Sequence, residues 1–275
     1  MKLCIRPHDI GTDTSADYLG KEIAKLGFYG VQLAVAKAIH DNDGSPEKLT
    51  AEAVKEIRAG FNSNGVEIPI LGAYFNPVHS DKGKVKAGAD KFGDHLKKAK
   101  DFGALYVASE TGSYNDDKWT YNPKNQTNEA FDEVLSVFAP LAQVAKEAKS
   151  CMSLEGAWGH CMYSPEQMAK LIKEIDTGYV RTTVDIYNYL YIDNYEERYN
   201  IFHKCLDLFG DKIVIFHIKD FVPEGDHLTE VALGKGIMGW DKIIPEIRSN
   251  LPNSLLVFEG VKDLIPSLEY FKTLL

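Results

Sequence analysis

The sequence predicts an α/β fold, a single (β/α)₈ barrel of the TIM-barrel type that spans residues 1–275. Short apolar runs alternate with longer amphipathic stretches along the whole chain, and this unit repeats eight times. Strands separated by helices pair in parallel, and eight such units in about 250 residues match this barrel. An open doubly wound sheet is the alternative, but it usually carries a phosphate-binding glycine pattern after its first strand, and "RPHDIG" does not match.

The first half of the chain supplies four strand–helix units. Strands are predicted at 2–6, 29–35, 67–75 and 104–112, and helices at 15–28, 49–65, 86–103 and 128–150. The first helix has apolar residues three and four positions apart. Thr50 is a candidate N-cap of the second helix, and Asn64-Gly65 is its stop signal. The polar residues 113–125 are predicted to form a loop.

The second half repeats this rhythm. Strands are predicted at 151–156, 180–186, 212–220 and 254–260, and helices at 164–175, 195–210, 239–250 and 264–275. Ser164 precedes a helix as its cap, and Pro165 occupies the first helical position. Residues 221–238 are predicted to form a longer loop. No linker rich in Pro, Gly or Ser divides the chain, so we expect one domain.

Composition limits the classes of function. A formal charge of −9 argues against broad electrostatic binding to nucleic acid or to an anionic membrane. No window has the roughly 18 apolar residues of a spanning helix, and the apolar run at the N-terminus is too short for a signal-peptide core. The four cysteines form no CxxC pair, which indicates reduced thiols and a cytoplasmic protein.

Four consecutive predicted strands end in a polar residue after an apolar run. These residues are Glu155, Asp185, His217 and Glu259, in "MSLE", "TTVD", "VIFH" and "LVFE". Their spacings of 30, 32 and 42 residues match the length of one barrel unit, with the long loop 221–238 in the last interval. The carboxyl ends of barrel strands meet at one mouth, so we expect the four side chains to converge there.

Three carboxylates at one point repel each other and are costly to desolvate, and a divalent cation removes this problem. Three oxygen donors and one imidazole suit Mn²⁺, Mg²⁺, Co²⁺ or Zn²⁺, with Mn²⁺ the first choice, and His217 would be a neutral ligand. A single acid at a strand end is often a helix cap or an ion-pair partner. Four in succession favour a metal site.

The four strand ends, with the segments "GKGIMGWDKIIPEI" and "YFNPVHSD", resemble the xylose-isomerase-like barrels. This group includes tagatose/psicose 3-epimerases, hydroxypyruvate isomerases and inosose dehydratases. The resemblance covers nearly the whole chain. It implies that Glu155, Asp185, His217 and Glu259 bind one divalent metal ion and that Glu155 and Glu259 are the catalytic acid/base pair. A sugar isomerase or epimerase that forms an enediolate is the implied function.

Five further residues are candidate substrate-binding groups. They are Asn188, His79, Lys219, Trp158 and Glu110, each at or near a predicted strand end. Several epimerases of the family have a His where this chain has Asn188, and an Arg in the loop after the seventh strand, where this chain has only Lys219 and Lys235 as cations. These departures leave the sugar open. His160 is expected to be an ordinary loop residue.

Three other functions compete with an isomerase. A lyase of the inosose-dehydratase kind could expel a β-hydroxyl from the same enediolate, and the "HIKD" sequence also occurs in that branch. A metallonuclease of the endonuclease IV kind would need more histidines at the site and a basic groove. A non-catalytic sugar-binding barrel is the fourth possibility. The expected partners are a small sugar or polyol and a second copy of the chain in a homo-oligomer.

Overall fold

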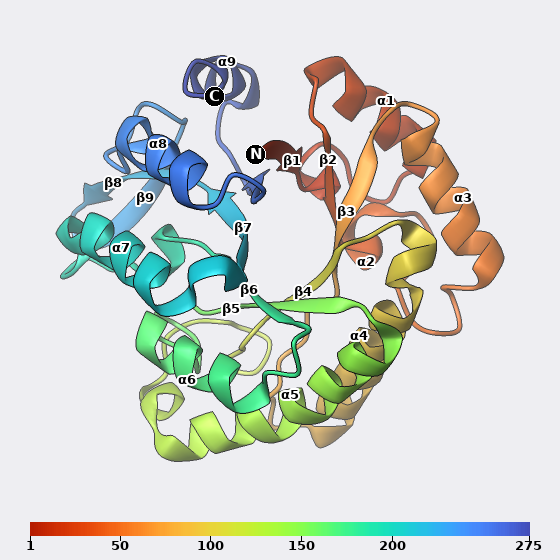
Figure 1. Cartoon of the computed structure of the whole chain (residues 1–275), viewed down its shortest axis with the longest axis horizontal. Helices are drawn as coiled ribbons and strands as arrows, with labels where there is room; N and C mark the ends of the chain where they lie inside the picture. Colours follow the sequence, from red (N-terminus) through yellow and green to blue (C-terminus); the bar gives the residue numbers. More distant parts are fainter.

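A computed structural model describes all residues, 1–275, and confirms the closed barrel of eight parallel strands (Figure 1). The order around the barrel is β1-β10-β7-β6-β5-β4-β3-β2. These strands are β1 Lys2–Ile5, β2 Gly30–Leu33, β3 Glu67–Gly72, β4 Tyr106–Glu110, β5 Cys151–Glu155, β6 Val180–Val184, β7 Ile213–Ile218 and β10 Leu255–Phe258.

A ring of helices surrounds the barrel, as the alternation predicts. The main helices are α1 Ala16–Leu26, α3 Ala51–Asn62, α4 Lys82–Phe102, α5 Asn128–Ala148, α6 Pro165–Ile175, α7 Arg198–Phe209, α8 Trp240–Asn250 and α9 Leu264–Lys272. The predicted caps are confirmed: Thr50 Oγ1 accepts a hydrogen bond from the Ala53 amide at 3.2 Å, and Ser164 Oγ accepts one from Gln167 at 3.4 Å. Each cap satisfies an amide that the first helical turn leaves free.

Residues 221–238 do not form a simple loop, so that expectation is wrong. They contain most of an antiparallel hairpin of β8 (Asp220–Glu224) and β9 (His227–Val231). Glu224 pairs with His227, which leaves a two-residue turn with Gly225 at φ +62°. A Gly-Asp turn between two short alternating runs is a hairpin signal. A short helix, α2 (Val35–Ala38), also follows β2, and residues 195–197 form a 3₁₀ turn before α7.

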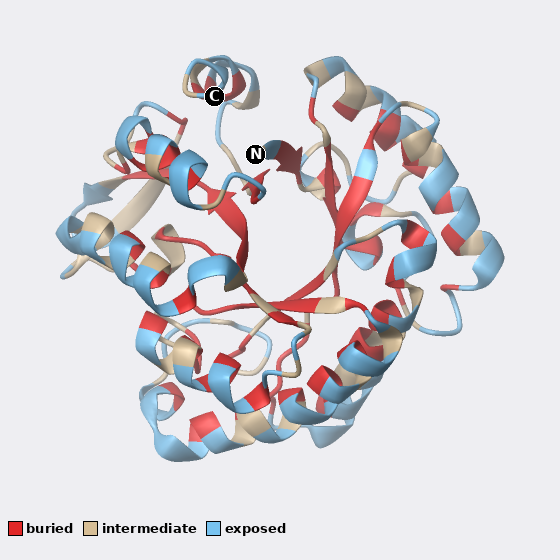
Figure 2. Cartoon of the chain, in the orientation of Figure 1, coloured by how far each residue is buried: buried red, intermediate tan, exposed pale blue.

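Apolar packing occupies the space between strands and helices and one end of the barrel interior. Figure 2 shows buried residues along the strands and on the inward faces of the helices. A separate apolar cluster is formed by Cys4, Ile70, Ala108, Val214, Ile215, Leu255 and Val257, all on barrel strands. The buried Glu155, Asp185 and His217 lie instead at the carboxyl ends of the strands, at the mouth of the barrel. No helix is both long and apolar enough to cross a membrane.

Candidate metal centre

The structure brings the four predicted strand-end residues together. Glu155 ends β5, Asp185 follows β6, His217 lies near the end of β7 and Glu259 follows β10. One ligand atom from each lies within 4.8 Å of the others. The side chains of Glu155, Asp185 and His217 are at most 5% exposed and that of Glu259 is 13% exposed. Four neighbouring strands in the same barrel register therefore produce one buried cluster.

The imidazole and one carboxylate of this cluster are held by residues from the first half of the barrel. His217 Nε2 lies 3.1 Å from Gln32 Oε1, so Nε2–H donates, because an amide oxygen can only accept. Gln32 Nε2 in turn donates to the Tyr74 hydroxyl at 2.5 Å. Glu259 Oε1 accepts from Arg6 Nη1 at 2.5 Å. Gln32 on β2 thus orients His217 on β7 across two intervening strands, whereas Arg6 after β1 orients Glu259 from the strand adjacent to β10. Nδ1 of His217 and Oε2 of Glu259 face the centre of the barrel.

Asn188, in the turn after β6, holds the other two carboxylates. Its side-chain Nδ2 donates to Glu155 Oε1 at 2.7 Å, and its backbone amide donates to Asp185 Oδ1 at 3.2 Å. In each of the four ligands one polar atom is therefore bound by the protein, and the second atom is directed inward. Outer hydrogen bonds of this kind fix ligand orientation in metal sites.

The inward atoms fit a cation. Asp185 Oδ2, His217 Nδ1 and Glu259 Oε2 are buried and make no hydrogen bond, although Lys219 Nζ forms ion pairs with the two carboxylate oxygens. His217 Nδ1 lies 2.7 Å from Glu259 Oε2 and 3.3 Å from Glu155 Oε2, close contacts in which neither pair of atoms meets hydrogen-bond geometry. Buried polar atoms without partners are rare in folded proteins. Three oxygens and one imidazole nitrogen form a donor set that suits a divalent ion.

The electrostatics of the cluster favour positive charge at its centre. Burial lowers the pKa of His217, but the carboxylates of Glu259 and Glu155 outweigh burial and raise it well above its ordinary value. Burial raises the pKa of Asp185 to about 6, although Lys219 opposes the shift. Burial also raises the pKa of Glu259, but His217 and Lys219 dominate and hold it well below its usual range. The same negative potential would attract a metal ion.

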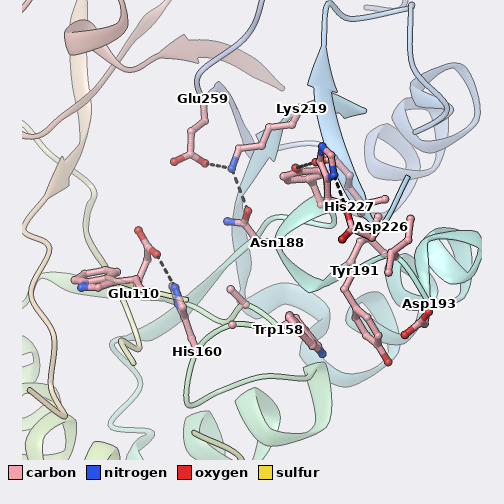
Figure 3. A pocket seen from close by; sticks show the side chains of 17 residues that line it. Glu110, Trp158, His160, Asn188, Tyr191, Asp193, Lys219, Asp226, His227 and Glu259 are labelled. Carbon is pink, nitrogen blue, oxygen red and sulfur yellow. Dashed lines mark hydrogen bonds and ion pairs between the residues drawn. The ribbon is translucent and has the colours of Figure 1, made fainter. Parts of the chain in front are cut away.

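Lys219 closes the cluster on the cavity side. Its Nζ lies 2.8 Å from Asp185 Oδ2 and 3.0 Å from Glu259 Oε2, and it donates to Asn188 Oδ1 at 3.1 Å. Figure 3 shows the ammonium group between Glu259 and Asn188. Burial lowers the pKa of Lys219, but Asp185 and Glu259 raise it well above its usual value, so the side chain stays charged.

A cavity of about 760 Å³ opens above this cluster. Glu259, Lys219 and Asn188 line its inner end, and Glu110 and His160 line another wall, where Glu110 Oε2 lies 3.5 Å from His160 Nε2 (Figure 3). Burial, then the charges of Glu155 and Glu259, raise the pKa of Glu110 to about 8, and burial lowers that of His160 to about 4. His160 lies in the loop after β5, as expected, but its side chain is buried in the wall of the cavity.

Trp158 lines the cavity, but neighbouring rings cover both of its faces. Tyr121 stacks on it at 4.7 Å between ring centroids and Tyr191 at 4.5 Å. Only the indole edge remains for a ligand. Trp119, which the sequence analysis did not select, also lines the cavity, with its ring 5.7 Å from His160 in an edge-to-face contact.

His79 does not line this cavity. Its Nδ1 accepts a hydrogen bond from the Asp81 amide at 2.9 Å, and its Nε2 lies 3.3 Å from Asp117 Oδ1. The neighbouring Asn76 donates to the carbonyls of Ser113 and Asp116. These contacts fix the loop after β4 to the start of α4, so a substrate contact by His79 stays a prediction that its present partners do not support.

Comparison with known proteins places the chain in a family. The model of the xylose isomerase-like TIM barrel matches residues 21–272. The chain belongs to this family. No curated protein matches the sequence significantly.

Several solved structures share the whole fold. A xylose isomerase-like protein from Mycobacterium smegmatis in complex with magnesium has a TM-score of 0.77 at 15% identity, over 99% of this chain and 95% of that one. A D-tagatose 3-epimerase-like protein has a TM-score of 0.76 at 18% identity, over 100% and 97%. The probable 3-DHS dehydratase from Bacillus anthracis has a TM-score of 0.73 at 14% identity, over 98% and 97%. Identities this low show the fold alone.

Proposed function

We propose that this chain is a divalent-metal-dependent isomerase or epimerase of a ketose or a related polyol-ketone. One observation carries the proposal: four ligand atoms from four strands lie within 4.8 Å of one another, and the protein binds the remaining polar atom of each ligand. A cation offsets the repulsion among three carboxylates. We propose Mn²⁺ for the site, with Mg²⁺, Co²⁺ and Zn²⁺ as alternatives, because all four accept oxygen and imidazole donors.

When bound, the cation would polarise a carbonyl and the neighbouring hydroxyl and acidify the C–H bond between them. We propose that Glu155 and Glu259 transfer the proton. They belong to β5 and to the end of β10, with β6 and β7 between them, and therefore approach the cluster from two sides. Proton removal from one face and return to the other gives an epimer, and return to the neighbouring carbon gives an isomer.

Lys219 and Asn188 are the proposed substrate-binding residues nearest to the acid/base pair. Lys219 stays charged beside Glu259, where it can stabilise negative charge on a substrate oxygen. The Asn188 amide already spans Glu155 and Lys219, so it can fix a substrate hydroxyl between them. We propose Glu110 and the edge of Trp158 as contacts for the outer part of the substrate, since both line the same cavity.

A lyase is the second candidate, and Glu110 is the observation that favours it. This carboxyl has its pKa raised to about 8, so it holds a proton at neutral pH, and it lies in the cavity wall. A protonated acid there could donate its proton to a leaving hydroxyl. A relative with the same fold is named a probable dehydratase. The cytoplasmic location and the homo-oligomer of the sequence analysis stay predictions.

Deuterium exchange distinguishes these functions. A panel of ketoses and inososes is incubated with the Mn²⁺-loaded protein in D₂O, and products are identified by NMR after the metal is removed. An isomerase or epimerase incorporates deuterium at carbon and forms a stereoisomer or an aldose, whereas a lyase forms a product that lacks one water. Glu155→Gln should abolish exchange, and Glu52→Gln, on the exposed face of α3, should leave it unchanged. Exchange that persists in Glu155→Gln contradicts the assigned acid/base pair.

A further inference from the structure

We propose that the substrate is an uncharged carbohydrate that carries no phosphate group. The inference rests on the proposed function, since it names the substrate class of the same site. Three features support it. The cavity wall beyond the metal cluster is acidic, and the two cations beside the cluster already have carboxylate partners. In addition, acidic side chains of the protein bind the loop amides with which barrels of this kind bind phosphate.

The wall beyond the metal cluster is acidic. Asp193 and Asp226 line the outer part of the cavity, and Lys219 is the only lysine or arginine among the residues that line it (Figure 3). His227 also lies there but is an exposed imidazole that pairs with Asp226 at 3.1 Å. A phosphate group carries between one and two negative charges at neutral pH. On a substrate whose carbonyl end lies at the metal cluster, that group would face carboxylates without a compensating cation.

The two cations beside the cluster are already engaged. Lys219 has three close oxygen partners, on Asp185, Glu259 and Asn188, as many as its ammonium has N–H donors. Arg6 binds Glu259 through Nη1 and Asp9 through Nε and Nη2, at 2.5 to 2.9 Å. A phosphate would have to displace carboxylates from these partners, including the buried Asp185. Leaving such carboxylates unpaired is costly.

The first loop that could bind phosphate is filled by a carboxylate of the chain. TIM barrels frequently bind phosphate with the loops that follow the seventh and eighth barrel strands. In the loop after β7, the amides of Gly234, Gly236 and Met238 all donate to the Asp220 carboxylate, at 2.9, 3.1 and 3.0 Å. Asp220 is 3% exposed. A Cβ atom at Gly236 would lie 2.2 Å from Asp220 Oδ1, so the loop closes tightly around this carboxylate.

The second loop shows the same arrangement. After the eighth barrel strand, β10, the amide of Gly260 donates to Asp9 Oδ2 at 2.8 Å. Asp9 is itself fixed by Arg6 at 2.8 Å. In both loops an acidic side chain of the protein accepts the hydrogen bonds that a phosphate oxygen would otherwise accept. Both loops present amide donors, but the carboxylates of Asp220 and Asp9 already accept their hydrogen bonds.

Chemical rescue by inorganic phosphate tests the inference without knowledge of the sugar. The melting temperature of the full chain is measured in potassium phosphate and in potassium chloride of equal ionic strength. We expect no specific effect on the wild type. Asp220→Ala vacates the three amides, so it should melt at a lower temperature and recover part of the loss in phosphate. Asp9→Ala serves as the second variant if Asp220→Ala does not fold.

Two results would overturn the inference. One is stabilisation of the wild type by phosphate as large as that of Asp220→Ala, because it would reveal a free anion site. The other comes from a sugar pair: D-fructose should bind or react at least about tenfold better than D-fructose 6-phosphate, and a preference for the phosphorylated sugar contradicts the inference. The phosphate measurement needs neither metal nor turnover. An enzyme without activity would therefore count against the proposed function, and phosphate binding against this inference.

Discussion

Two halves of the barrel make different contributions to one site. The four candidate ligands lie at or just after the ends of β5, β6, β7 and β10, whereas residues on or just after β1, β2 and β3 hold two of those ligands. Arg6 binds Glu259, Gln32 binds His217, and Tyr74 binds Gln32. The second half thus supplies all four ligands and orients two of them through Asn188, whereas the first half orients His217 and Glu259.

The largest effect should follow the loss of a ligand in the second half. Asp185→Asn preserves shape but replaces an inward carboxylate oxygen that has no hydrogen bond. We expect its Mn²⁺ affinity, measured by titration calorimetry, to fall by at least about 100-fold, more than the loss of an outer partner costs. Asp207→Asn, on the exposed face of α7, is the matched control and should bind as the wild type does. Equal affinities in the two variants would show that Asp185 is not a ligand.

An intermediate effect should follow the loss of the partner of the imidazole. Gln32→Leu leaves all four ligands in place but removes the acceptor of His217 Nε2–H. Outer partners of this kind contribute about 10- to 100-fold in metal affinity. Tyr74→Phe removes only the hydroxyl that holds Gln32, so it should have a smaller effect of the same sign. A Gln32→Leu protein with wild-type Mn²⁺ affinity would show that the hydrogen bond from His217 to Gln32 does not contribute to metal binding.

A third test concerns Arg6, which binds Glu259 and Asp9 with different nitrogens of one planar group. Arg6→Lys keeps the positive charge but loses the planar guanidinium that binds two carboxylates at once, and Arg6→Met loses both the charge and this geometry. We expect metal affinity to fall in the order wild type, Arg6→Lys, Arg6→Met, with about a tenfold loss in the last. Titration of Mn²⁺ into all three proteins measures this order. An Arg6→Lys protein as weak as Arg6→Met would mean that geometry, and not charge, is the whole contribution of Arg6.

The smallest effect on the site should come from the outer helix ring. His95 of α4 is fully buried, and burial lowers its pKa to about 4. As pH falls from 6.5 toward 4, the unfolded chain gains a proton at this imidazole that the folded chain does not, so the free energy of unfolding falls. At pH 5 the loss is about 2 kcal/mol. His95→Leu should flatten this fall in denaturant titrations without any change in metal affinity. The same pH dependence in His95→Leu as in the wild type would show that His95 does not cause the fall in stability.

The fold and the ligands could be predicted from the sequence because both depend on patterns among residues that are close together in the chain. Each ligand follows an apolar strand, so its position in the chain indicates its position at the mouth. The hairpin after β7 differs from the predicted loop, although the Gly225-Asp226 turn is itself a hairpin signal in the sequence. Cap residues such as Thr50 were also predictable, since their contacts lie within three residues.

The supporting residues could not be predicted, because their contacts depend on how the barrel closes. Gln32 and His217 are 185 residues apart, and Arg6 and Glu259 are 253 apart. Nothing near Gln32 in the sequence indicates that β2 places it across the barrel from β7. The contact of His160 depends on barrel closure in the same way, since its partner Glu110 ends a different strand. Local sequence thus predicts the four ligands at the barrel mouth, and the closed structure reveals the residues that hold them in place.

Metal stoichiometry measures directly whether the four residues at the barrel mouth bind an ion. The wild type and Glu259→Gln are stripped of metal, re-equilibrated with Mn²⁺, desalted and analysed for bound metal per chain. We expect about one bound ion per chain in the wild type and far less bound metal in Glu259→Gln, because the variant lacks the charge of the inward Oε2 atom. A wild-type protein that retains no ion, or a variant that retains as much as the wild type, would contradict the metal centre at the barrel mouth.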